Sequence, residues 1–234
     1  MKKPLVSFVI RTKNEAKFIG KVLKYVFKQT YKNIEVVVVD SGSTDRTLQI
    51  VSQYPVRVLK ISPSKFNYSR ALNFGISKSG GEFIVIISGH SVPISDDWLE
   101  CGLRHFKSRQ VGAVTGTYSE WPLGYFIRVL GKKDPTFKGK VVHKCKWMTN
   151  TNAIIRRDCW QKYKFDENLK DGCEDYDWAC EMLARGYDVV KDPGFGVFHS
   201  HYLLGRPGYM FMHRKWKSVV KGIDKKRRKP QAGV

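Results

Sequence analysis

Short apolar, β-branched runs alternate with amphipathic segments of helix length over the first 120 residues of this 234-residue chain. The apolar runs predict strands at 6–10, 34–39, 57–61 and 83–87. The amphipathic segments predict helices at 16–28, 45–54, 69–79 and 96–107. Apolar strands separated by helices are typical of a mostly parallel sheet that is covered on both faces. The first half therefore predicts an α/β fold with a Rossmann-like central sheet flanked by helices.

The pattern loosens after residue 120. Residues 121–146 mix aromatic residues, glycine, proline and lysine without a clear period, which predicts a long loop or lid. Order returns in elements that we expect to be a strand at 152–155, a helix at 174–185, a strand at 188–190 and a basic helix at 208–221. We expect disorder from residue 225 onward.

The net charge of +21, from 42 basic and 21 acidic residues, predicts attraction to polyanions. Anionic lipid and diphosphate-bearing substrates fit this charge; the chain lacks a helix-turn-helix, zinc or RNA-recognition pattern that would favour nucleic acid. Five scattered cysteines without a Cys-x-x-Cys pair indicate a reducing, cytoplasmic compartment. No apolar run approaches the roughly 18–20 residues of a membrane span, so we expect neither a signal peptide nor a transmembrane helix.

Polar residues follow the first two predicted strands, at the point where each strand ends. Asp40 and Ser41 follow the second strand, and Thr12 and Glu15 follow the first. Open parallel sheets bind ligands beyond the carboxyl ends of their strands, and a carboxylate there suits the donors of a nucleoside better than a bare phosphate. The alternative is a plain turn whose residues cap the next helix.

Several motifs stand in a fixed order along the chain: VSFVIRTKNE at 6–15, DSGSTD at 40–45, ALNFGI at 71–76, NAIIRR at 152–157 and EDYDW at 174–178. In this order they resemble family 2 glycosyltransferases, and among them bacterial rhamnosyltransferase-like enzymes of polysaccharide assembly. The resemblance implies a GT-A fold with a nucleotide-sugar-binding half at 1–120, an acceptor-side half at 121–205 and a basic helix and tail at 206–234. It also implies a nucleotide-sugar donor whose base and ribose contact Thr12, Glu15, Asp40 and Ser41, with Arg70 near the diphosphate.

Two acidic residues, Glu174 and Asp175, open the predicted helix at 174–185. Their ordinary role would be a favourable interaction with the helix N-terminus. An inverting sugar transfer needs a base for the proton of the acceptor hydroxyl, and a carboxylate at a loop-to-helix junction suits that task. By the resemblance, Asp175 is the general base and Glu174 the second choice. Asp177 either supports the pair or is simply solvated.

The position of the family's metal-binding Asp-x-Asp reads Ser88-Gly89-His90 in this chain. This puts the usual divalent metal in doubt, because Mg²⁺ prefers oxygen ligands whereas an imidazole suits Mn²⁺. His90 could bind a metal or, as a cation, neutralise a diphosphate directly; the alternative is a polar residue without a ligand. His199 is a second candidate for metal or diphosphate binding.

Apolar and cationic side chains mix in segment 208–221, and the run 225–229 adds five positive charges. Such a composition is typical of helices at an anionic membrane surface, although a solvated helix packed on the domain is the alternative. With the resemblance, it predicts an enzyme peripheral on the cytoplasmic face of a membrane, acting on a glycan or lipid-linked acceptor. A non-catalytic nucleotide-sugar-binding relative and a basic nucleic-acid-binding protein are the competing hypotheses.

Overall fold

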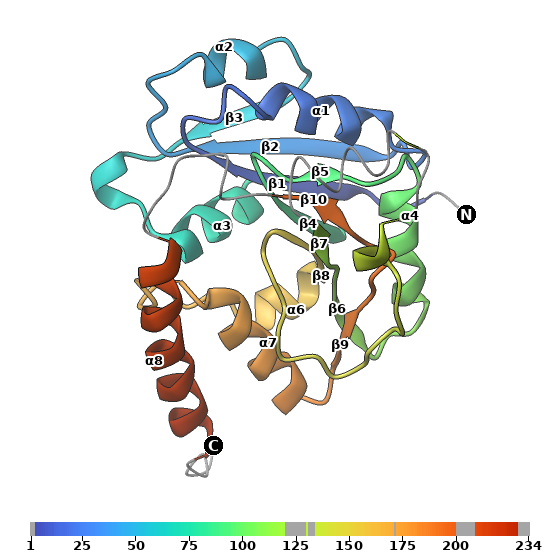
Figure 1. Ribbon diagram of the computed structural model, residues 1–234, viewed down its shortest axis with the longest axis vertical. Coiled ribbons are helices and arrows are strands. Elements are labelled where there is room, and N and C mark those ends of the chain that lie inside the picture. The colour runs from blue at the N-terminus through green and yellow to red at the C-terminus, as the bar shows by residue number, and fades with distance from the viewer. Residues whose placement is uncertain (1–2, 120–129, 131–133, 171, 200–208, 229–234) are drawn as a thin grey trace.

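The computed structural model describes residues 3–119, 130, 134–170, 172–199 and 209–228. A seven-stranded sheet forms its centre (Figure 1), in the order β3 (Arg57–Lys60), β2 (Ile34–Asp40), β1 (Val6–Thr12), β4 (Phe83–Ser88), β8 (Asn152–Arg156), β6 (Val111–Thr115) and β9 (Asp188–Lys191). The first four strands of this order are parallel, as are β6 and β9, while β8 runs antiparallel to both of its neighbours. The mostly parallel sheet predicted from the sequence is confirmed.

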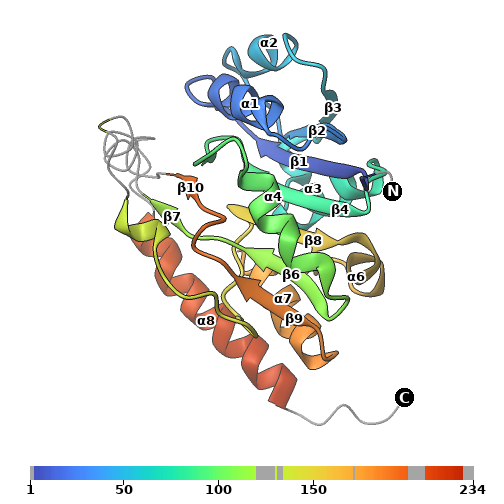
Figure 2. The same ribbon diagram turned by 90° about the vertical axis from the view of Figure 1, so that its right-hand side faces the viewer.

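Helices cover both faces of the sheet (Figure 2), and each face has its own hydrophobic cluster. Alternate side chains of a strand point to opposite faces, so Phe8 and Ile10 join one cluster and Val9 joins the other. The first cluster takes side chains from α1 (Ile19–Lys28), α2 (Thr47–Val51) and α4 (Trp98–Leu103). The second takes them from α3 (Tyr68–Ser77), α6 (Arg157–Lys162) and α7 (Glu174–Ala184).

Several short elements differ from the sequence prediction. Strand β6 and a small sheet of β5 (Val92–Pro93), β10 (Val197–Phe198) and β7 (Tyr118–Ser119) were not predicted. A two-residue strand has no period that a sequence pattern could reveal. The helix expected at 16–28 begins at Ile19, the one at 45–54 shrinks to α2, and the one at 96–107 divides into α4 and a 3₁₀ turn at Arg104–Lys107. Residues 121–129 and 131–133 of the loop expected at 121–146 lie outside the described residues; its described end contains a 3₁₀ turn at Pro135–Phe137.

Helix α8 (Tyr209–Arg228) extends past the predicted end at 221, so the prediction of disorder is wrong for residues 225–228; residues 229–234 lie outside the described residues. Arg227 donates to Asp177 Oδ1 at 2.7 Å and also pairs with Glu181, while Tyr176 donates to Asp224 at 3.0 Å. Asp177 and Glu181 on α7 thus neutralise one charge of the basic run at 225–229. The run of positive charges in the sequence did not reveal these partners. Within the described residues, no helix combines the length and the apolar composition needed to cross a bilayer.

Candidate functional site

The parallel strands β1, β2 and β4 end at one edge of the sheet, where their loops contact one another. Thr12 is the register partner of Asp40, and Gly89 N donates to the carbonyl oxygen of Arg11 at 3.1 Å. A Cβ atom at Gly89 would lie 3.0 Å from Thr12 Oγ1 and 3.2 Å from both Arg11 O and Glu15 Cγ. The loop after β4 therefore packs against the end of β1 so closely that only glycine fits there without displacing its neighbours.

Asp40 is buried and holds its own loop. Its Oδ2 accepts hydrogen bonds from Gly42 N at 3.0 Å and Ser43 N at 3.1 Å, and its Oδ1 accepts one from Ser43 Oγ at 2.5 Å. Ser41, also buried, donates through its backbone N–H to Thr12 O at 3.1 Å. The turn given above as the alternative is thus present, and the nucleotide contact of Asp40 and Ser41 stays a prediction.

Thr12 and Glu15 lie buried at the same edge. The hydroxyl oxygen of Thr12 is buried and has no hydrogen-bond partner among the described residues, so it can still donate to or accept from a ligand. Glu15 Oε1 lies 2.9 Å from His90 Nδ1, and both side chains are almost fully buried. This contact joins the loop after β1 to the loop after β4.

The two histidines singled out in the sequence come together at this edge. The rings of His90 and His199 stack with centroids 4.5 Å apart, and His199 Nδ1 lies 2.8 Å from Ser91 Oγ. Glu15 is the acidic neighbour of the pair. Among the residues that the structure describes, no group of three or more His, Cys, Asp and Glu side chains is arranged to bind a metal ion. These side chains therefore do not fit a divalent ion that the protein holds by itself.

The acidic pair opens α7 after a sharp turn of the backbone. Gly172 has φ 97°, and Cys173 has φ 66°, a left-handed conformation that is strained for a residue with a Cβ. Asp175, which is partly exposed, accepts from Asn150 N at 3.1 Å and from Tyr176 N at 2.9 Å. Burial and the negative charge of Glu174 raise the pKa of Asp175 well above its ordinary range, against the opposing effect of these backbone donors.

Arg11 connects the strand ends to the acidic pair. Its Nη1 lies 3.4 Å from Glu174 Oε1, and its guanidinium lies 4.9 Å from the ring centroid of Tyr68. Asn150 Nδ2 donates to the same Glu174 oxygen at 3.2 Å. Tyr68 and Asn150 were not predicted as residues of this site. Arg11 stands in the motif at 6–15, but its contact with Glu174 was not predicted.

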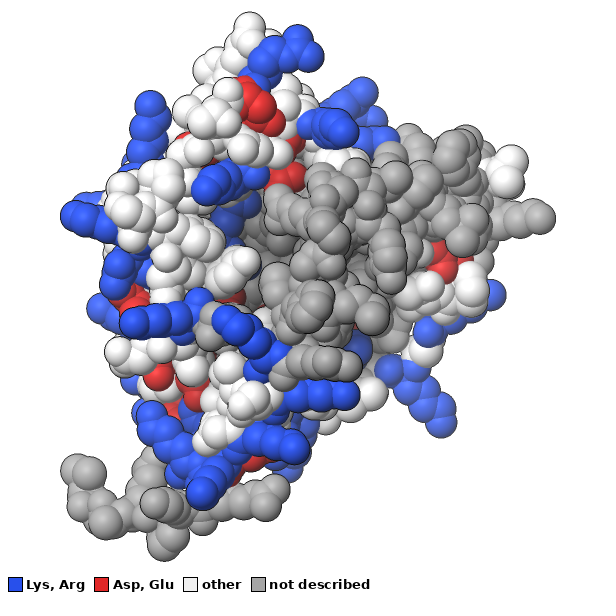
Figure 3. Space-filling view, turned by 60° about the vertical axis from the view of Figure 1, so that its left-hand side comes forward, with Lys and Arg blue, Asp and Glu red and all other residues white. Residues whose placement is uncertain are grey.

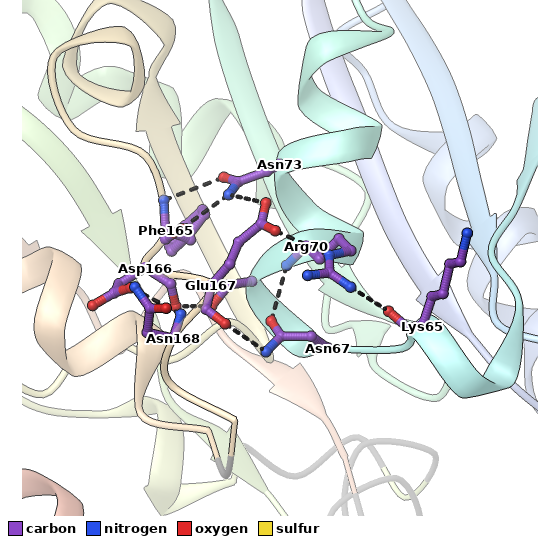
Figure 4. A network of polar contacts seen from close by, with 9 residues as sticks. Lys65, Asn67, Arg70, Asn73, Phe165, Asp166, Glu167 and Asn168 are labelled. Carbon is purple, nitrogen blue, oxygen red and sulfur yellow. Dashed lines mark hydrogen bonds and ion pairs between the residues drawn. The ribbon is translucent and has the colours of Figure 1, made fainter.

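Arg70 contacts a loop of the second half of the chain (Figure 4). Its Nε donates to Glu167 Oε2 at 3.0 Å and its Nη1 to Lys65 O at 3.1 Å. Asn73, on the same helix, donates to Glu167 Oε1 at 3.1 Å and to Phe165 O at 2.9 Å. This network fixes the loop that leads toward α7, and the diphosphate contact of Arg70 stays a prediction. Asp177, whose role was left open, lies in the ion pair with Arg227 described above.

A match to a known family separates the glycosyltransferase hypothesis from the nucleic-acid-binding hypothesis. The profile described as "Glycosyl transferase family 2" matches residues 7–163, which include β1, β2, β4 and the loops at their ends. The chain belongs to glycosyl transferase family 2. This membership agrees with the motifs and argues against a basic nucleic-acid-binding protein.

Curated relatives of this family 2 chain include sugar transferases from bacteria and archaea. The chain is 34% identical over 224 residues to a dolichyl N-acetyl-α-D-glucosaminyl phosphate 3-β-D-2,3-diacetamido-2,3-dideoxy-β-D-glucuronosyltransferase of Methanococcus voltae, covering 84% of this chain and 66% of that protein. It is 28% identical to the O-antigen chain rhamnosyltransferase WbaN of Salmonella anatum, covering 74% of this chain and 59% of WbaN. The glycosyltransferase GlyG of Streptococcus pneumoniae is 31% identical, covering 49% of this chain and 39% of GlyG. The chain thus spans only part of the length of these relatives.

Solved structures with the same architecture are GT-A glycosyltransferases. The mannosyltransferase PcManGT from Pyrobaculum calidifontis, solved with GDP-Man and Mn²⁺, has a TM-score of 0.68 and 23% identity, over 89% of this chain and 59% of its own. TarS of S. aureus in complex with UDP-GlcNAc has a TM-score of 0.66 and 20% identity, over 82% of this chain and 57% of its own. At 20–23% identity these structures show the fold alone, and they confirm that this family 2 chain has the GT-A fold.

Proposed function

We propose that this protein transfers a hexosyl or deoxyhexosyl group from a nucleotide-sugar donor to a hydroxyl of a glycan or lipid-linked acceptor. The observation that carries the proposal is the ion pair of Arg11 with Glu174, which joins the loops at the carboxyl ends of the strands to the acidic pair of α7. Family membership and the sugar transferases among the relatives support it. A donor at the strand ends would have the acidic pair beside its sugar.

Asp175 is the general base of this proposal, with Glu174 as its neighbour. The acceptor oxygen attacks the anomeric carbon, Asp175 takes the proton of the hydroxyl, and the nucleoside diphosphate leaves with the bonding electrons of the broken bond, which inverts the anomeric centre. The raised pKa of Asp175 suits a base, because a carboxylate with a higher pKa holds the transferred proton better. Its partial exposure leaves the side chain accessible to an acceptor.

The donor side of the proposed site consists of the strand-end residues. Thr12, Glu15, Asp40 and Ser41 would contact the base and ribose, and Arg70, His90 and His199 would lie on the diphosphate side. The hydroxyl of Thr12, which is buried and has no hydrogen-bond partner in the described part of the chain, supports the first part, and the stacked histidines support the second. Because the described side chains do not form a metal site, we propose that a divalent ion, Mn²⁺ before Mg²⁺, binds only together with the donor diphosphate.

The basic helix α8 supports a location at the cytoplasmic face of an anionic membrane. Figure 3 shows Lys and Arg side chains gathered on the lower part of one face, where α8 lies. The exposed lysines of this helix are Lys215, Lys217, Lys221, Lys225 and Lys226. Each positive charge near an anionic surface contributes about 1 kcal/mol of attraction.

Vesicle sedimentation tests this location. Exchange of Lys217, Lys221 and Lys225 for Gln keeps Arg227 and its contacts to α7, and we expect it to weaken binding to anionic vesicles by up to about 100-fold. The control exchanges the exposed Lys24, Lys28 and Lys32 for Gln. Equal weakening by both triple variants, or equal binding to neutral vesicles, would argue for unspecific attraction and against this surface.

A donor screen tests the transfer itself. The purified protein is incubated with each nucleotide sugar and with glycan or lipid-linked acceptors, and both the nucleoside diphosphate and the glycosylated acceptor are quantified. We expect release that depends on acceptor with one donor, and loss of that release in Asp175→Asn. Tight donor binding with no transfer to any acceptor, in parent and variant alike, would favour the non-catalytic relative instead.

A further inference from the structure

Arg11 is the last but one residue of β1, and it points to the face of the sheet that α3 and α7 cover. Its guanidinium lies over Tyr68, the first residue of α3, and its Nη1 lies 3.4 Å from Glu174, the first residue of α7. The two ion-pair partners are 163 residues apart in the sequence. One side chain of the donor-side strand therefore contacts the helix that carries the acidic pair.

The burial of this contact makes it more than a surface ion pair. The Arg11 side chain is 16% exposed and that of Glu174 is 6% exposed, so each charge would be costly without the other. A planar guanidinium can cover an aromatic ring and reach a carboxylate at the same time, which a lysine ammonium cannot do equally well. The position thus favours arginine for its shape as well as for its charge.

Asn150 completes the arrangement around the acidic pair. It is buried; its side chain donates to Glu174 Oε1 at 3.2 Å and its backbone N–H donates to Asp175 Oδ2 at 3.1 Å. Arg11 and Asn150 therefore converge on one oxygen of Glu174, and Asn150 fixes Glu174 and Asp175 relative to each other. Glu174 has a defined place between a cation and an amide.

We propose that Arg11 is a positioning residue, which clamps Glu174 against Asn150 and so sets the geometry and the local charge around Asp175. This role rests on the proposed function, in which Asp175 acts as the base. Arg11 itself touches neither acceptor nor donor in this role; it acts through Glu174 and through its own positive charge.

The groups that shift the pKa of Asp175 come from α7, from β1 and from the loop before β8. Glu174 on the same helix raises the pKa of Asp175, whereas Arg11 on β1 and the backbone donors Asn150 and Tyr176 lower it. Cys173 is a neutral neighbour, because burial and the two carboxylates raise the pKa of its thiol to about 12. Loss of the Arg11 charge removes an opposing cation, so Asp175 should hold its proton to a higher pH.

A titration of the Asp175 carboxyl tests this inference without any substrate. The carboxyl carbon is followed by ¹³C NMR in protein labelled at aspartate, with Asp175→Asn to assign the signal. We expect Arg11→Gln to raise the midpoint by about one pH unit and Arg11→Lys to raise it less. Lys13→Gln removes a charge from an exposed residue only two positions after Arg11 and is the matched control, with no shift expected.

Equal midpoints in the parent and both Arg11 variants would overturn the inference, as would a Lys13→Gln shift as large as that of Arg11→Gln. If Arg11→Gln does not fold, Arg11→Lys still tests the clamp. It keeps the charge, but lysine reaches less far and loses the contact with the ring of Tyr68, so the midpoint of Asp175 should rise. An unchanged midpoint in Arg11→Lys would oppose the clamp.

The rate of transfer separates this inference from the proposed function. With an identified donor, Arg11→Gln should lower kcat and move the acid limb of its pH profile upward, while KM for the donor stays near that of the parent. A parent protein that transfers no sugar refutes the proposed function but leaves the titration result standing. Transfer with an unmoved acid limb and an unmoved midpoint refutes the role of Arg11 alone.

Discussion

Asp40 and Asp175 lie at the same edge of the sheet, but the partners that fix them differ: those of Asp40 are close to it in the sequence, and those of the acidic pair are distant. Asp40 accepts its hydrogen bonds from Gly42 and Ser43, which lie within three residues of it. The pair of Glu174 and Asp175 is held by Asn150, about 25 residues away, and by Arg11, 163 residues away. The carboxylate of Asp40 is fixed by its own turn, whereas the acidic pair takes its geometry only when both halves of the chain have folded together.

The origin of these hydrogen bonds determines which property each carboxylate can have. A carboxylate within its own turn can present a fixed acceptor to a ligand, and its substitution should change binding. A carboxylate next to a second one, in a partly buried place, has a shifted pKa and can exchange a proton, so its substitution should change the chemical step. Substitution of each carboxylate tests this division between binding and chemistry.

The largest effect is expected for Asp175→Asn. The amide keeps the shape of the side chain but cannot accept the proton of the acceptor hydroxyl, so turnover should fall by about 10²-fold or more while donor affinity survives. Initial rates and calorimetric titration with the nucleoside diphosphate measure the two quantities separately. Near-normal turnover would move the role of base to Glu174, and loss of donor binding would break the division.

The next effect is expected for Asp40→Ala in the affinity for a nucleoside diphosphate. Loss of a charged hydrogen-bond partner should weaken binding by about 1.5–3 kcal/mol, or roughly 10- to 150-fold. Ser43→Ala is the control, since it removes one bond of the turn and keeps the carboxylate. If Ser43→Ala weakens binding as much, Asp40 acts through its turn; if a folded Asp40→Ala binds normally, Asp40 is no ligand of the nucleotide.

A smaller effect concerns stability as a function of pH. The folded-state pKa of Asp175 is raised, so the folded protein binds this proton more tightly than the unfolded chain does. The stability of the parent should therefore fall, relative to Asp175→Asn, as the pH rises from the ordinary carboxyl range through the raised pKa, by on the order of 1 kcal/mol. Urea unfolding of both proteins at pH 5 and pH 8 measures the difference, and a pH-independent difference would contradict the raised pKa.

The same contrast explains how much of the molecule the sequence predicted. The apolar periods of β1, β2 and β4 predicted the sheet, and the polar residues after these strands marked the edge where we propose that the donor binds, because both signals are local. Arg11 and Asn150 contact the acidic pair only through tertiary structure, and no period or motif revealed them as partners. The ion pair of Arg227 with Asp177 was hidden in the same way, and for that reason a basic run was taken for a disordered tail.

The last and smallest effect concerns metal and His90, which lies on the strand-end side of the comparison. Its Nδ1 contacts Glu15 of the donor-side loop, and its ring stacks on His199, which follows β10. Neither Ser88 at the end of β4 nor Ser91 in the loop after it carries a charge. An ion would therefore depend on the imidazoles and on the diphosphate oxygens of the donor. We therefore expect weak metal binding in the absence of nucleotide, and stronger binding of Mn²⁺ than of Mg²⁺ in its presence.

Turnover of the parent and of His90→Ala in excess EDTA, and again after Mn²⁺ or Mg²⁺ is restored, separates three cases. Loss of parental activity in EDTA that Mn²⁺ restores better than Mg²⁺, with a weaker response in His90→Ala, supports an ion shared by His90 and the diphosphate. Full activity of the parent in EDTA rules out the ion and leaves the leaving-group charge to cationic side chains. An unaffected His90→Ala removes this residue from the site, and the stacked pair would then be part of the packing that holds β10 against the strand ends.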